Sequence, residues 1–324
     1  ATYGALCNAF AFYQFEYIEF YHNGTLISHY EPDYLYNRYM QDWSEEEAKI
    51  DGPLIGDFDL SDRKTKGGAA QTFNLYFNDF FTMFAKPFPA FLLSQNLICR
   101  VKLRSNVAEM VQTDGTGPDF SFTDFHLSIR WVKPIGYETI NKSVMSEPFP
   151  LIDEEIIPVK RTVVGNSSST RFDFNLQEIN NKIAVQVPFF IRKQSNKAAG
   201  ASTTFEKLDK FTMTQNSIEV TPEKYPITDF IYRNEILPFL EADGTAALLD
   251  DNLYTVCYAD HLKLHLHHHL CDERYSGSKP FFNMPDVQFS IWYTNAPSDT
   301  QDLIIYVENL RRLAIVNGII TILP

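Results

Sequence analysis

Short apolar and aromatic runs, broken by polar and turn-forming residues, recur through most of the chain, a pattern typical of β-strands. The clearest runs are AFAFYQFEYIEFY near the start, FSFTDFHLSIRWV in the middle, and DVQFSIWYTN and DLIIYVENLRRLAIV near the end. The first run leads into Asn23-Gly24 and a short apolar stretch, and Asn-Gly between apolar runs is the strongest local signal for a β-hairpin. Many short strands with little helix predict a sandwich or barrel.

One segment has a helical period instead. Five large side chains recur there in steps of three and four residues: Tyr34, Leu35, Arg38, Tyr39 and Trp43. Glu45, Glu46 and Glu47 then predict the solvated end of this helix. The polar, glycine-rich segment 51–70 predicts a loop.

A second polar segment, residues 136–166, predicts a linker, because it carries scattered proline and charged residues and ends in VGNSSST. A length of 324 residues fits two domains. We therefore expect a first domain over residues 1–160, linker included, and a second over residues 161–324.

Composition narrows the class of protein. Hydrophobic residues make up 44% of the chain and aromatic residues 15%, enough for sizeable buried cores. The net charge of −13 disfavours binding to nucleic acid, whose phosphates an acidic surface repels. The cysteines, Cys7, Cys99, Cys257 and Cys271, have no CxxC spacing, which favours small buried thiols in a reducing compartment over a zinc or redox site.

The nearest feature to a basic patch is Arg100, Lys102 and Arg104, which alternate with Val101 and Leu103. This spacing is typical of the solvated face of one strand.

Four segments, in order, resemble the major capsid proteins of large eukaryotic DNA viruses, a double jelly-roll lineage shared with adenoviruses, virophages and tailless bacteriophages. They are YGALCNAFAFYQFEYIEFYHNGTLI with the Trp43 helix, FNLYFNDFFTMFAKPFPAFLLSQNLICRVKLR, FSFTDFHLSIRWV, and DLIIYVENLRRLAIVNGIITIL. In the last, Asn309, Leu310, Arg311 and Gly318 stand at the places of the family's closing strand. The order of the segments carries more weight than any one of them.

This resemblance implies an all-β fold of two tandem eight-stranded jelly rolls, with short helices in loops. In the family further strands precede the first segment, so the first jelly roll is expected to lack its opening strands. The implied function is a structural capsid subunit of the virion, assembled inside the host cell, and not an enzyme. Pseudo-hexagonal homotrimers would tile an icosahedral shell beside neighbouring capsomers, penton and minor capsid proteins and an internal membrane, with no specific nucleic acid.

Two other functions stay open. The same fold serves as a membrane-bound assembly scaffold in poxvirus-like systems, and a single jelly roll serves in lectins and in cupin-like metal proteins. His265, His267 and His269 would share one face of a strand and could hold a divalent ion. The alternative is a histidine-rich surface or interface strand, and a cupin would need a later histidine, which is absent after His269.

We expect no catalytic site and no cofactor. The sequence contains no G-x-S-x-G, P-loop or G-x-G-x-x-G motif. Three N-glycosylation sequons occur, at Asn23, Asn141 and Asn166, and without a secretory signal we interpret them as chance matches, with glycosylation as the alternative.

Overall fold

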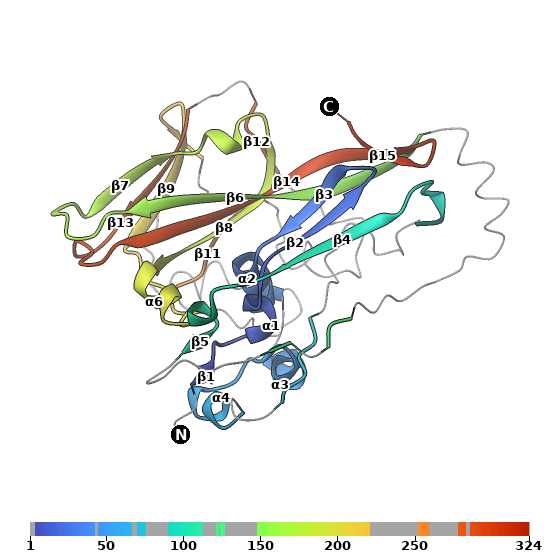
Figure 1. Cartoon of the computed structure of the whole chain (residues 1–324). Helices are drawn as coiled ribbons and strands as arrows, with labels where there is room; N and C mark the ends of the chain where they lie inside the picture. The colour runs from blue at the N-terminus through green and yellow to red at the C-terminus, as the bar shows by residue number, and fades with distance from the viewer. Residues whose placement is uncertain are drawn as a thin grey trace.

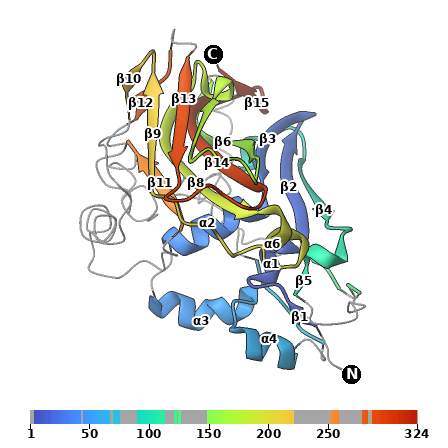
Figure 2. The same ribbon diagram turned by 90° about the vertical axis from the view of Figure 1, so that its left-hand side faces the viewer.

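The computed structural model of the chain describes residues 4–42, 45–66, 70–75, 90–112, 121–122, 124–126, 148–220, 252–258, 278–282 and 286–323. Strands dominate these ranges and are arranged in three layers (Figures 1 and 2).

The first layer is a four-stranded antiparallel sheet in the order β10-β9-β13-β7. Its strands are β7 (Arg171–Asn175), β9 (Lys210–Gln215), β10 (Ile218–Glu219) and β13 (Val287–Trp292).

The second, central layer is built on the longest strand, β14 (Gln301–Val316). One edge of β14 pairs with β6 (Phe149–Val163), and its other edge pairs first with β8 (Ile183–Lys193) and then with β15 (Ile319–Ile322). The strands β11 (Tyr254–Cys257) and β12 (Lys279–Pro280) pair with β8. Short turns of helix connect elements here: η3 (Gln177–Ile179) and α6 (Gln194–Ala198).

The third layer is formed by the described residues up to 126, which we call the N-terminal half; the described residues from 148 onward are the C-terminal half. A sheet in the order β3-β2-β4 contains β2 (Phe15–His22), β3 (Thr25–Tyr30) and β4 (Leu97–Leu103), and β1 (Ala5–Leu6) pairs with β5 (Val111–Gln112). The helical elements are α1 (Phe10–Tyr13), α2 (Pro32–Asp42), α3 (Glu45–Ile55), α4 (Leu60–Lys66), η1 (Ala90–Leu92) and η2 (Val107–Glu109). None of the helices in the described part of the chain is long and apolar enough to cross a membrane.

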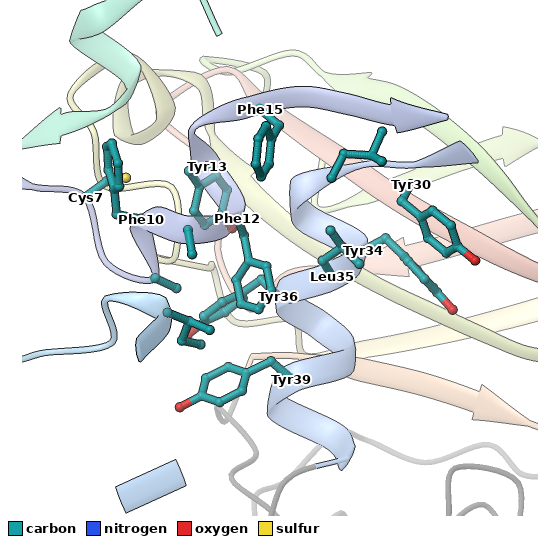
Figure 3. Packing of buried hydrophobic residues seen from close by; sticks show 14 of the residues in the cluster. Cys7, Phe10, Phe12, Tyr13, Phe15, Tyr30, Tyr34, Leu35, Tyr36 and Tyr39 are labelled. Carbon is teal, nitrogen blue, oxygen red and sulfur yellow. The ribbon is translucent and has the colours of Figure 1, made fainter. Parts of the chain in front are cut away.

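The central sheet is buried on both faces, which explains its continuous apolar sequence. On β14, Leu303, Ile305 and Val307 belong to the core shared with the first layer, whereas Ile304 and Tyr306 belong to the core shared with the N-terminal half. The N-terminal core is strongly aromatic, with side chains of α1, α2 and β2 converging in Figure 3. One sheet therefore joins the two halves through two different cores.

The predicted hairpin is confirmed. Asn23 and Gly24 connect β2 to β3 with φ angles of 48° and 76°, the left-handed conformations that a two-residue type I′ turn requires. Glycine and asparagine are the residues that adopt these angles at least cost.

Two local predictions are wrong. Glu45–Glu47 begin a new helix, α3, instead of ending α2, and residues 51–70 include the end of α3 and all of α4. Burial of Ile55 stabilises the end of α3, whereas α4 buries no residue and begins after Asp59, whose side chain accepts a hydrogen bond from Asp62 N at 2.9 Å.

The linker prediction is also wrong where the structure describes it. Residues 149–163 form β6, which pairs with β14 from Phe149 opposite Ile315 to Val163 opposite Gln301. Pro158 makes this segment resemble a loop, but proline is tolerated on a strand edge that needs no N–H donor. The division into domains at residue 160 stays a prediction.

Candidate functional site: the charged seam between the halves

Helix α2 of the N-terminal half packs against the central sheet, and polar groups meet there in a buried seam. Asp33, in the first turn of α2, binds Arg192 of β8 with two parallel hydrogen bonds of 2.7 and 2.9 Å. Arg192 is 2% exposed and also donates to the carbonyl of Ser202 at 2.8 Å. A bidentate pair of this kind fixes both distance and orientation.

The pair is ionised. Burial alone would raise the pKa of the Asp33 carboxyl, but the charge and hydrogen bonds of Arg192 lower that pKa below its usual value. Burial alone would lower the pKa of the Arg192 guanidinium. The charge and hydrogen bonds of Asp33 outweigh this effect and raise that pKa above its usual value. Each charge is therefore stable only while its partner is present.

A second buried contact of α2 is made by Tyr34 and Arg38. Glu308 of β14 is fully buried and accepts hydrogen bonds from Tyr34 Oη (3.0 Å) and Arg38 Nη1 (3.4 Å). Tyr34 and Arg38 are four residues apart and so share one face of the helix. Glu308 stands at an irregularity in the pairing of β14 with β8.

The seam ends at a partly exposed cluster around Glu31. This carboxylate accepts hydrogen bonds from Tyr306 Oη (2.9 Å) and Lys160 Nζ, and it lies 3.8 Å from His29 Nε2. Burial raises the pKa of Glu31, but His29 and Lys160 lower it more. The pKa of His29 is raised, mainly by its hydrogen bond with Glu31, although burial lowers it. Glu19, whose Oε1 lies 3.2 Å from His29 Nδ1, raises this pKa further.

A polar hollow of about 270 Å³ opens at this end of the seam. Residues of both halves line it: Glu16, Glu31, Pro32, Asp33, Arg104, Asn106, Glu109, Lys160 and Lys197. All four carboxylates are in ion pairs, with Lys102, Lys160, Arg192 and Arg104 respectively. Each carboxylate of the hollow is therefore neutralised by a cation of the same chain, which is typical of a structural contact.

The C-terminal hairpin makes a further joint between the halves. Its strand β15 donates from Ile320 N to Nδ1 of the buried His22 on β2 at 3.2 Å, and Ser94 N donates to Gly318 O at 2.8 Å. An apolar cluster lies beneath, formed by Ile27, Leu92, Leu313, Ile315 and Ile320. Burial lowers the pKa of His22, so its imidazole is neutral and its Nδ1 is an acceptor.

The residues singled out in the sequence are not brought together in this seam. His265, His267, His269 and Asn141 lie outside the described residues. Asn23 and Asn166 are exposed in left-handed turns and make no contact described for the seam. Within the described part of the chain, no three His, Cys, Asp or Glu side chains gather as metal ligands would.

The structure also tests the predicted basic strand face and the predicted buried thiols. Arg100 and Lys102 lie on the exposed face of β4 as predicted, but Arg104 follows the strand and donates to the carbonyls of Tyr13 and Phe15. Cys7 is fully buried, and burial raises the pKa of its thiol to about 12, so it acts as a small apolar group.

No protein-family model and no curated protein matches the sequence. Solved structures do match along its whole length. A quasi-atomic model of the PBCV-1 virus capsid is 13% identical, covers 100% of this chain and 87% of its own, and has a TM-score of 0.69. The Faustovirus major capsid protein is 10% identical, with coverages of 96% and 73% and a TM-score of 0.55. The chain has the double jelly-roll fold.

The double jelly roll confirms the predicted fold class. Within the described residues the sandwich of the C-terminal half is the more complete of the two, and its sheets enclose a core that includes Val187, Phe189, Phe289 and Leu303. The seam residues then have a defined place in this fold, because they join α2 to strands β8 and β14 of the central sheet.

Proposed function

We propose that this chain is a structural major capsid protein whose trimers form pseudo-hexagonal plates that tile an icosahedral virus shell. The observation that carries the proposal is the match of its double jelly-roll fold to the PBCV-1 capsid over the whole chain. Two jelly rolls of similar outline give each subunit two corners, so three subunits related by a threefold axis give six.

The seam supports this function because a shell subunit must keep its two halves in a fixed relation. The buried pairs Asp33–Arg192 and Arg38–Glu308 join the halves, and the central sheet contributes to both cores. A rigid subunit loses little conformational entropy when it assembles. Stable trimers of this kind bury more than ~2,000 Å² of surface.

The partners follow from the proposed place in the shell. They are further copies of the chain, neighbouring capsomers, penton and minor capsid proteins and an internal membrane, in the virion. The net charge of −13 argues against a general nucleic-acid surface. The ion-paired hollow in the seam fits a structural protein better than an enzyme.

Electron microscopy of the purified protein tests this function. Averaged images are expected to show flat, threefold plates with a six-cornered outline, and these plates should join edge to edge at high concentration. Mass spectrometry of purified virus particles should also find the chain in abundance. Single two-lobed particles at every concentration, or a chain missing from mature particles as for a scaffold, would contradict the proposal.

A further inference from the structure

We propose that the outward face of the sheet β3-β2-β4 is a contact surface between copies of this chain. We call it the β4 face and define it by Tyr17, Glu19, Tyr21, Leu26, His29, Ile98, Arg100 and Lys102. The inference rests on the proposed function and adds to it the surface through which the copies meet.

An apolar row crosses the full width of this sheet. Tyr21 of β2 is paired with Leu26 of β3 on one side and with Ile98 of β4 on the other, and residues paired in this way point to the same face. Leu26 is 39% exposed and Ile98 is 54% exposed. Their neighbours Phe20 and Cys99 point to the opposite, inner face.

Two cations border this row and are held in place by the sheet itself. The guanidinium of Arg100 lies 4.6 Å from the centre of the Tyr21 ring and 4.0 Å from Glu19, although 59% of its side chain is exposed. Lys102 contacts Glu16 at 2.5 Å and lies 5.6 Å from the Tyr17 ring. Side chains already held in one position lose less entropy on binding, and tyrosine and arginine are enriched where protein interfaces are tightest.

The charge balance of the β4 face points to a second copy as the partner. Copies with a net charge of −13 repel one another, so they can approach at least cost through a face whose charges cancel. Arg100 is matched by Glu19 on this face, and Lys102 by Glu16 beside it. A phosphate-rich partner would instead need cations without carboxylates beside them.

Replacement of the exposed apolar side chain tests the surface. Ile98→Asp should weaken association at least tenfold in sedimentation velocity, because it buries a new charge at the contact. Ile218→Asp is the matched control, since Ile218 is 69% exposed on β10 of the other sheet, and it should assemble like the wild type. Arg100→Glu should also weaken association, because it unbalances the charges of the face.

Near-ultraviolet circular dichroism of all three variants should match the wild type, which separates a lost contact from a lost fold. A wild type that forms trimers while Ile98→Asp and Arg100→Glu do so equally well would overturn the β4 face and leave the proposed function standing. Equal weakening by Ile218→Asp would overturn it too. A wild type that stays monomeric would overturn both.

Discussion

Asp33 and Arg192 are the residues on which the joint between the halves depends most. They lie 159 positions apart in the chain, yet they form a bidentate ion pair that is almost closed to water. A buried charge that loses its partner is strongly destabilising, whereas an exposed pair contributes little.

Asp33→Asn should therefore lower the free energy of unfolding by about 3–5 kcal/mol, because it leaves the Arg192 charge buried without a counter-charge. Urea denaturation measures this change. Glu178→Gln is the control, since it removes the charge from a partly exposed pair in which Arg161 Nη2 contacts both carboxylate oxygens, and it should cost less than about 1 kcal/mol. Equal effects of the two substitutions would refute the structural importance of the seam.

The sequence could not reveal this pair. Asp33 resembles an ordinary acidic residue in the first turn of a helix, and Arg192 resembles the charged end of an apolar strand. The only signal is the alternation of side chains along the two strands. On β14, Tyr306 and Glu308 point to the face that meets α2, and on β8, Phe190 and Arg192 do the same. Recognising it requires knowing that both faces of the sheet are buried.

Among the elements, the β2–β3 hairpin shows what local sequence predicts well. Its turn depends on two adjacent residues, Asn23 and Gly24, and needs nothing from the rest of the chain. Strand β6 shows the opposite case, because its pairing with β14 joins segments far apart in sequence and its Pro158 resembles a loop residue.

Gly24→Ala should destabilise the chain by roughly 1 kcal/mol, because the left-handed φ of 76° is costly for alanine although no atom lies within 4 Å of the added methyl group. Gly200→Ala should cost clearly more. Its φ is 69°, and its Cβ would lie 2.4 Å from the backbone of Val111. Thermal unfolding of the two variants compares the costs, and the reverse ranking would contradict the close approach of Val111 to Gly200.

Docking of the C-terminal hairpin on His22 should depend on pH. The pKa of His22 is lowered in the folded chain, so the unfolded chain binds a proton more readily. The stability that His22 contributes is complete above the ordinary histidine pKa of about 6.5 and is lost as the pH falls below it. Protonated Nδ1 would also face the Ile320 N–H as a second donor.

His22→Asn, which keeps an acceptor but does not titrate, should reduce the loss of stability between pH 7.5 and pH 5. His29→Gln is the opposite control. The pKa of His29 is raised, so its contribution is complete below about pH 6.5 and fades as the pH rises through the raised value. Denaturation at a series of pH values measures both slopes, and unchanged slopes would rule out these two histidines as the titrating groups.

For the whole molecule, the central feature is one sheet that contributes to both cores. β14 supplies Ile305 to one core and Tyr306 to the other, and β8 does the same with Phe189 and Phe190. The halves should therefore unfold together, in a single transition seen alike by circular dichroism and by tryptophan fluorescence. Two well-separated transitions would show that the halves are independent.

Native mass spectrometry of the unmodified chain shows whether it assembles as a shell subunit must. A double jelly-roll shell subunit should appear as a trimer, at three times the chain mass of 37.3 kDa, and should keep that mass on dilution to the concentrations used for spraying. A species of one chain mass at every concentration and salt condition would contradict the account.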